Sequence, residues 1–303
     1  MAILSLFRCH LYPVFYKTWH LNGISIRTAV SVSYDVYGPQ PSESKQHIIA
    51  LHGLLGSKKN WKSLSTKIST STKACVISAD ARNHGDSPHE STHSYLDLAA
   101  DVSQLLQTLS LSQSHIIGHS MGGRTGMALA LNEPTKVQSL IIVDISPIPR
   151  SPNPIDSAFP SLLAAMKNVN FEGADSGHKA KTIAKKSLVE AGFDERSLGF
   201  ILMSIGERSD KTFAWKYNLD ALANSFNEIA MFPDELKGKQ YTGPTLFIGG
   251  GKSDYLRKSD EPAIKEFFPQ SSLTYIEHVG HNAHFEDPSA FLKIVYDFYA
   301  KHL

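Results

Sequence analysis

Short apolar runs alternate with longer stretches of helical periodicity along most of this chain. Six such runs, each followed by a loop that contains Gly, Asp, His or Ser, lie at residues 47–51, 74–79, 115–117, 140–143, 245–248 and 273–276. Strand-like runs that alternate with helical patterns are typical of a mostly parallel sheet with helices on both faces, an α/β fold. Ligands of such sheets bind beyond the carboxyl ends of the strands. The loops after these runs are therefore where we expect the functional residues.

The alternation breaks after the fourth run. A region that opens with five prolines within residues 147–160 continues to residue 242 and shows helical patterns without a clear strand. An amphipathic helix is expected at 179–191 and a more apolar one at 198–205. The pattern predicts a core formed by residues 35–146 and 243–303, with residues 147–242 inserted as a helical lid over the strand ends.

The first 34 residues differ in composition from the rest of the chain. They contain no Asp or Glu, whereas Arg8, Lys17 and Arg27 are spaced among Leu, Phe, Tyr, Ser and Thr. This composition is typical of a mitochondrial transit peptide, and we expect residues 1–34 to direct the protein to mitochondria. The alternative is an irregular N-terminus that leads into a first strand near residues 24–37 of a cytoplasmic protein.

The overall composition excludes several classes of protein. Its 42% hydrophobic and 19% charged residues lie close to the average for soluble globular proteins. The 30 Lys and Arg residues against 29 Asp and Glu give no basic excess that would favour nucleic acid as a partner. Two distant cysteines, Cys9 and Cys75, predict neither a disulfide framework nor a zinc site. No window approaches eighteen uninterrupted apolar residues, so no transmembrane segment is expected.

One serine stands in an unusually small environment, in the stretch HIIGHSMGGRT at residues 115–125. Gly118 and Gly122 flank Ser120 at two residues on either side, after a predicted strand and before a predicted helix. Gly-x-Ser-x-Gly in this context is typical of a nucleophile elbow, a strained turn that lifts the hydroxyl clear of the sheet. We therefore expect Ser120 to be a nucleophile.

A serine hydroxyl needs a base within hydrogen-bonding reach and a third group that orients this base. The stretch YIEHVGHNAHFEDP near the C-terminus supplies three histidines. His281 follows a glycine in a loop just after a strand, and we select it as the general base. His284 is the alternative base or a pocket residue, whereas His278 is expected to be packed at the end of the strand.

The orienting acid has more than one candidate. Asp144 ends the strand LIIVD and Asp254 follows the next strand in GGGKSDYL, so both agree with the chain order Ser, Asp, His of such hydrolases. We favour Asp144, because it lies directly at a strand end, with Asp254 as the alternative. Asp220, in the predicted lid, is a third candidate.

An acyl transfer also needs donors for the oxyanion that forms in the transition state. The backbone N–H of Met121, directly after the nucleophile, is one expected donor. The other is expected from the loop HGLLGS at residues 52–57, at Leu54. No metal, nucleotide or other cofactor is expected, because the protein itself supplies the nucleophile and the donors.

Five motifs occur in order along the chain: HGLLGSKKNW, DARNHGDSP, GHSMGG, DISP and GHNAHFEDP. With them the chain resembles the α/β-hydrolase superfamily over about residues 33–303, and within it the α/β-hydrolase domain-containing protein eleven group. The tetrapeptide RNHG at 82–85, with DISP, is more specific than the serine motif. The resemblance implies Ser120, His281 and an aspartate as the reactive residues, esters such as diacylglycerols as substrates, and a mitochondrial location.

The sequence therefore predicts a serine hydrolase that cleaves carboxylic esters, acylglycerols or short to medium acyl esters, through an acyl-enzyme. One alternative is an acyltransferase that uses the same residues and delivers the acyl group to an alcohol. The other is a non-catalytic partner of a mitochondrial enzyme complex. Five apolar residues of the predicted lid are either an acyl-chain site or the core of the lid itself: Phe159, Leu162, Leu163, Met166 and Phe200.

Overall fold

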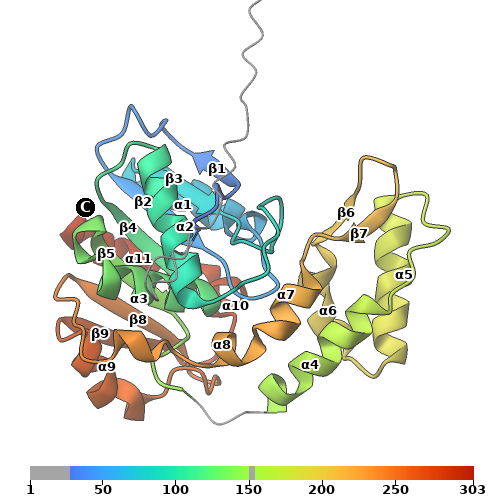
Figure 1. Cartoon of the computed structure of the whole chain (residues 1–303). Helices are drawn as coiled ribbons and strands as arrows, with labels where there is room; N and C mark the ends of the chain where they lie inside the picture. Colours follow the sequence, from blue (N-terminus) through green and yellow to red (C-terminus); the bar gives the residue numbers. More distant parts are fainter. Residues whose placement is uncertain (1–27, 150–153) are drawn as a thin grey trace, which may run out of the picture.

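A computed structural model describes residues 28–149 and 154–303 (Figure 1). Most of the predicted transit segment, residues 1–27, lies outside the described residues. The described chain folds into a core built on a large sheet and a mostly helical lid that projects from one side of it (Figure 1).

The central sheet has seven strands in the order β1-β3-β2-β4-β5-β8-β9. All neighbouring strands run parallel except β1, which pairs antiparallel with β3. This confirms the predicted fold class, and the six apolar runs all become strands. The strands are β1 (Tyr34–Tyr37), β2 (His47–Leu51), β3 (Cys75–Ala79), β4 (Ser114–His119), β5 (Val137–Val143), β8 (Thr245–Gly250) and β9 (Ser271–Ile276). Every residue of β2, β3, β4 and β8 is buried, because helices cover both faces.

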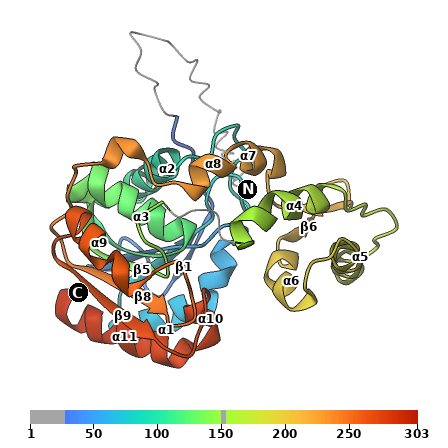
Figure 2. The ribbon, with the colours of Figure 1, turned by 90° about the horizontal axis from the view of Figure 1, so that it is seen from below.

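Two separate apolar layers cover the sheet (Figure 2). On one face lie α2 (Tyr95–Thr108), α3 (Met121–Asn132) and α9 (Glu261–Phe267). On the other face, α1 (Lys62–Thr72) packs beside α11 (Pro288–His302). Short helices complete the core: η1 (Lys58–Trp61), η2 (Pro134–Lys136), η3 (Asp234–Leu236), η4 (Lys258–Asp260) and α10 (Ala283–Glu286).

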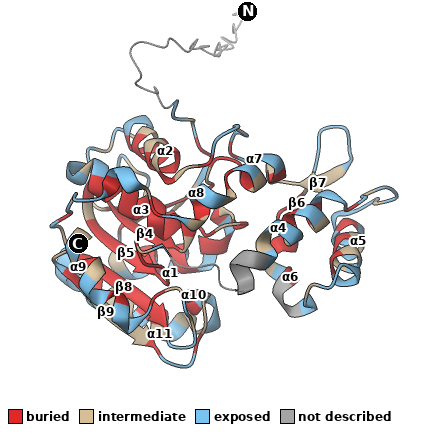
Figure 3. Cartoon of the chain, turned by 60° about the horizontal axis from the view of Figure 1, so that its bottom comes forward, coloured by how far each residue is buried: buried red, intermediate tan, exposed pale blue. Residues whose placement is uncertain are grey.

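The lid has a hydrophobic core of its own, formed by residues such as Leu163, Met166 and Leu188 (Figure 3). Its helices are α4 (Pro154–Lys167), α5 (Gly177–Glu190), α6 (Glu195–Leu202), α7 (Leu219–Asn224) and α8 (Phe226–Ala230). From Phe232 onward the chain packs in the main core again, with Leu236 and Tyr241, although these residues precede the predicted end of the insertion at 242.

The expectation that the lid contains no strand was wrong. A two-stranded hairpin joins β6 (Ile205–Glu207) to β7 (Phe213–Trp215), with Ile205 paired to Trp215 and Glu207 to Phe213. Strands of three residues are too short to produce an alternating pattern of their own. Packing of the β7 aromatic side chains against the lid core holds the hairpin in place.

Buried histidines are a second feature of the core. Six of them in the described chain have their pKa lowered, and in each the main cause is burial, which disfavours the charged imidazolium: His52, His84, His93, His115, His119 and His284. The pKa falls to about 3 for His93 and His284, and to about 4 for His115. These imidazoles are therefore neutral in the folded protein at neutral pH.

We expect this set of histidines to make the protein sensitive to mild acid. Above about pH 6.5 they are neutral in both the folded and the unfolded chain. As the pH falls below this value, the unfolded chain takes up protons that the folded chain does not, so each histidine lowers the free energy of unfolding, by at most on the order of 1 kcal/mol per pH unit. Urea unfolding at pH 7.5 and 5.5 measures this loss.

The variant His115→Gln is the control, because it removes one of the six titrating imidazoles at a position remote from the other five. Between the two pH values, the free energy of unfolding of this variant should fall by less than that of the wild type. A free energy of unfolding that stays constant between pH 7.5 and 5.5 would contradict the expectation.

Candidate active site

Ser120 lies at the sharp turn between β4 and α3. Its backbone has φ 51° and ψ −116°, a conformation that costs free energy in a residue with a side chain. The flanking glycines are required by close approach, because a Cβ on Gly118 would lie 2.3 Å from the Gly122 carbonyl oxygen, and one on Gly122 would lie 2.5 Å from that of Leu51. The local sequence thus permits a turn that larger residues would prevent.

The structure brings three of the predicted site residues into one chain of hydrogen bonds. His281 Nε2 lies 3.1 Å from Ser120 Oγ, and His281 Nδ1 lies 2.7 Å from Asp144 Oδ2. In the arrangement that satisfies both contacts, the Nδ1–H donates to the carboxylate, and Nε2 accepts from the serine hydroxyl. The imidazole is therefore held in the tautomer that can remove a proton from Ser120.

Asp144 is fully buried and has further donors besides His281. The Gly250 N–H donates to its Oδ1 at 2.8 Å, and the Ser253 hydroxyl donates to its Oδ2. These groups belong to β8 and the loop after it, the neighbour of β5 in the sheet. A buried carboxylate with this set of donors is stabilised in its charged form and fixed in orientation.

The other two candidate acids lie elsewhere. Asp254 pairs with Arg257 at 3.1 Å on the surface. Asp220 pairs with Lys167 at 2.5 Å, and its side chain is 85% exposed. Neither carboxylate contacts a histidine in the described chain, so Asp144 alone among the three lies against His281.

The two other histidines of the C-terminal stretch differ from His281. The expectation that His278 is packed was wrong, because it follows the end of β9, is exposed, and pairs with Asp287 at 3.0 Å. His284 is buried, stacked against Trp61 and close to the His119 ring. It is neither hydrogen-bonded to Ser120 nor part of the cavity beside it.

Leu54 and Met121, the predicted oxyanion donors, both line the cavity at Ser120. In the described chain, neither backbone N–H donates to another protein group. Gly53 lets the loop approach the nucleophile, since a Cβ there would lie 3.4 Å from the Cβ of Ser120 and 2.8 Å from His119 Nδ1. Two free amides thus lie beside the hydroxyl, where a developing oxyanion needs donors.

A cavity of about 670 Å³ opens at Ser120 between the core and the lid. Its wall is mostly apolar, with Leu54, Ile145, Phe159, Phe200, Phe226 and Phe285 among the lining residues. Phe159 and Phe200 line the cavity and also pack against the lid core, whereas Leu162, Leu163 and Met166 pack in the lid core and do not line the cavity.

Several supporting contacts were not predicted. The Tyr255 ring lies over the His281 ring at 4.0 Å between centroids, and the His119 Nε2–H donates to the His281 carbonyl at 2.9 Å. The Glu286 carboxylate accepts from the Gly280 N–H at 2.8 Å and the Asn282 N–H at 3.2 Å, which holds the histidine loop. Glu286 belongs to the motif GHNAHFEDP, which identified the loop of His281, so this motif could have indicated its role. Nothing in the local pattern signals Tyr255.

In residues 28–149 and 154–303, no group of three His, Cys, Asp or Glu side chains could hold a metal ion. Over the same residues, no helix is both long and apolar enough to span a membrane.

Comparisons with known proteins identify the fold family of the chain. Residues 46–288 match the family model described as alpha/beta hydrolase fold. The chain is 36% identical to the sn-1-specific diacylglycerol lipase ABHD11 of Xenopus laevis, over 89% of this chain and 84% of that protein. It is 38% identical to the protein of the same name from Mus musculus, over 84% and 80%. A solved marine microorganism esterase superposes with a TM-score of 0.80 at 31% identity, over 89% of this chain and 100% of that one. The chain belongs to the α/β-hydrolase fold family.

Proposed function

We propose that this protein is a serine hydrolase that cleaves carboxylic esters through an acyl-enzyme. The observation that carries the proposal is the chain of hydrogen bonds from Ser120 through His281 to Asp144, with Ser120 and His281 lining an apolar cavity. The membership of the family and the likeness to an esterase structure support it.

The proposed reaction has two halves. Ser120 Oγ attacks the carbonyl carbon of the ester while its proton passes to His281 Nε2, and Asp144 stabilises the resulting imidazolium. The C–O bond to the alcohol then breaks, and the alcohol leaves with the proton from His281. In the second half, water loses a proton to His281 and attacks the acyl carbon. The bond to Ser120 Oγ then breaks, His281 returns the proton to Ser120, and the acid is released. The Leu54 and Met121 amides donate to the oxyanion in both halves.

The proposed substrates carry an apolar acyl group, as acylglycerols and short or medium acyl esters do. The aromatic and aliphatic wall beside Ser120 favours such a group because burying each methylene stabilises the complex by about 0.8 kcal/mol. The names of the diacylglycerol lipase relatives point to the same class.

The choice of acid is tested by two matched variants, Asp144→Asn and Asp254→Asn. We expect Asp144→Asn to lower kcat by about 10⁴-fold, because an amide cannot hold His281 in the required tautomer. Asp254→Asn should change kcat little, since Asp254 pairs with Arg257 at the surface. Turnover of an acyl ester by purified variants measures both, with Ser120→Ala as the inactive reference. A nearly silent Asp144→Asn together with a severe Asp254→Asn would contradict the assignment.

The acyl preference is tested with a panel of esters graded by chain length, together with diacylglycerol. We expect kcat/KM to rise by up to roughly fourfold per added methylene until the cavity is filled. Phe200→Ala should flatten this rise, because Phe200 lines the cavity. Phe171→Ala is the matched control, since Phe171 packs in the lid against Trp215, outside the cavity. An equal effect of both variants would argue against an acyl site beside Phe200.

Two further experiments separate the alternative functions. With ethanol present, an acyltransferase yields more ester than acid, whereas a hydrolase yields acid. A non-catalytic partner of an enzyme complex would leave Ser120 unlabelled by a fluorophosphonate probe, which reacts with an activated serine.

We also propose that residues 1–34 direct the protein to mitochondria, because they combine Arg8, Lys17 and Arg27 with no acidic residue. Fused to a fluorescent protein, this segment should carry the reporter into mitochondria. Replacement of the three basic residues by Ala should leave the reporter in the cytoplasm. A diffuse cytoplasmic signal from the unaltered segment would overturn the proposal.

A further inference from the structure

The tetrapeptide RNHG at residues 82–85 has no part in the reaction described above. The side chains of Arg82 and Asn83 bind α2 and the segment just before it. Arg82 forms a buried ion pair with Asp101, at 2.6 and 2.7 Å, and the Asn83 amide donates to the Thr92 carbonyl at 3.0 Å. His84 is different, because its ring reaches the loop that carries the Leu54 amide.

The imidazole of His84 accepts a hydrogen bond from that loop. Its Nδ1–H donates to the Arg82 carbonyl at 3.0 Å, which leaves the Nε2 lone pair free to accept the Leu55 N–H at 3.2 Å. The ring is completely buried, and burial together with His52 and His93 lowers its pKa well below the ordinary value. A neutral ring in this tautomer is what the Leu55 N–H requires.

The lid holds the other backbone group of the same residue. Tyr217, just before α7, donates its hydroxyl to the Leu55 carbonyl, and its ring packs against that of His84 in a T-shaped contact with 5.4 Å between centroids. The backbones of His84 and Tyr217 form an isolated antiparallel bridge, and the Asn218 N–H donates to the Asn83 carbonyl at 3.1 Å. The RNHG loop, the lid and the loop of residues 52–57, which we call the oxyanion loop, therefore meet at Leu55.

The conformation of Leu55 explains why such support is needed. The Gly56 N–H donates to the Gly53 carbonyl at 2.9 Å, which closes a turn with Leu54 and Leu55 at its centre. Leu55 has φ 56°, as the third residue of a type II turn requires, a position that favours glycine. A leucine there is strained, and the strain persists only where surrounding groups hold the backbone.

We propose that His84 and Tyr217 are positioning residues. They hold Leu55, and through it the Leu54 amide, in the position from which this amide donates to the oxyanion. The inference rests on the proposed function, because it assigns Leu54 to the oxyanion site of that reaction. It adds that a residue of the lid contributes to transition-state stabilisation through the loop, without touching the substrate.

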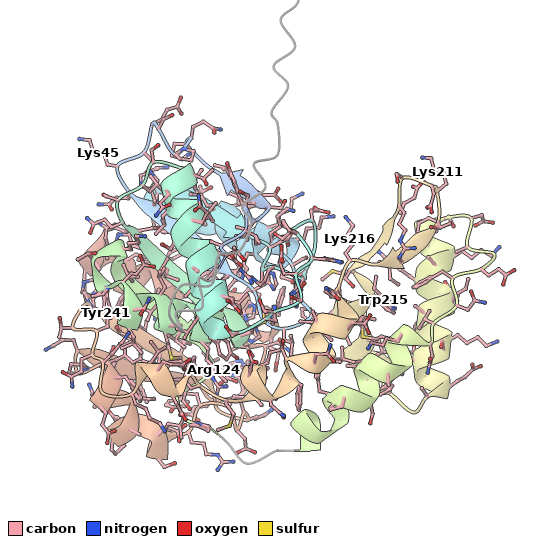
Figure 4. All side chains as sticks on the ribbon, in the orientation of Figure 1. Lys45, Arg124, Lys211, Trp215, Lys216 and Tyr241 are labelled. Atoms are coloured by element: carbon pink, nitrogen blue, oxygen red, sulfur yellow. The ribbon has the colours of Figure 1, made fainter. Side chains whose placement is uncertain are left out.

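The test uses two matched variants, Tyr217→Phe and Tyr241→Phe. Tyr217→Phe keeps the ring and its contact with His84 but removes the hydroxyl. Tyr241 is an equally buried tyrosine whose hydroxyl also donates to a backbone carbonyl, that of Val137, on the side of the core away from the lid (Figure 4). We expect Tyr217→Phe to lower kcat by about tenfold or more, up to the roughly 10²- to 10³-fold loss caused by removing an oxyanion donor outright, with KM little changed. Tyr241→Phe should leave kcat unchanged.

A trifluoromethyl ketone provides a readout that a purely structural role does not move. Ser120 adds to it to form a tetrahedral oxyanion, so its Ki should rise in Tyr217→Phe in proportion to the fall in kcat/KM. A second pair of variants tests the imidazole: His84→Leu removes the acceptor, whereas His84→Gln supplies a side-chain oxygen and should recover part of kcat. This pair also serves if Tyr217→Phe folds poorly, which urea unfolding reports.

The outcomes separate the two proposals. Fluorophosphonate labelling that misses Ser120 in the wild type, with activity retained in Ser120→Ala, overturns the proposed function. If Ser120 is labelled and Ser120→Ala is inactive, the proposed function stands. The positioning roles alone are then overturned if kcat and Ki are the same in Tyr217→Phe as in Tyr241→Phe, and kcat is the same in His84→Leu as in His84→Gln.

Discussion

The site depends on one buried carboxylate and the groups that must surround it. Asp144 has no exposed surface, and a charge in such a place is stable only when every oxygen has donors. Those donors are His281 Nδ1–H, the Gly250 amide and the Ser253 hydroxyl. They come from the end of β8, the loop after it and the loop after β9, the two strands that follow β5 in the order of the sheet. The donors required by the Asp144 carboxylate therefore fix the positions of these loops, and with them the base His281, which reaches Ser120.

The lid is joined to the same set of loops and is not an independent unit. Arg124, one turn after Ser120 in α3, donates to the carbonyls of Ile229 and Ala230 at the end of α8 and to that of Ser146 after β5 (Figure 4). The Tyr95 hydroxyl also donates to the Ile229 carbonyl at 2.7 Å. These bonds occupy carbonyls that a short helix leaves without partners. The helix that begins at the nucleophile thus also fixes one end of the cavity wall.

The sequence predicted those parts of the molecule that local patterns determine. Buried strands appear in the sequence as apolar runs, and the turn at Ser120 requires glycines two residues before and two residues after the serine. The choice among Asp144, Asp254 and Asp220 could not be made this way, because two of them follow a strand in the same manner. What separates Asp144 is that it contacts His281, 137 residues away, while the other two carboxylates pair with nearby cations. The β6–β7 hairpin was missed because its strands are held by packing within the lid.

Strain in the backbone connects these observations. Leu55, Ser120 and Asp144 all have positive φ without being glycine, and all three lie at the site. Regular structure holds two of them: the Ser120 N–H donates to the Val143 carbonyl at 3.0 Å and the Asp144 N–H to that of Ile248 at 2.8 Å, so both continue the ladders of the sheet.

Leu55 has no such ladder. Its backbone groups depend on the side chains of His84 and Tyr217, which are contributed by a distant loop and by the lid. Side-chain hydrogen bonds open more readily than a ladder of the central sheet, because fewer contacts must break together. The oxyanion loop is therefore the part of the site whose geometry depends most on the rest of the molecule, while the nucleophile and the acid stay fixed by the sheet itself.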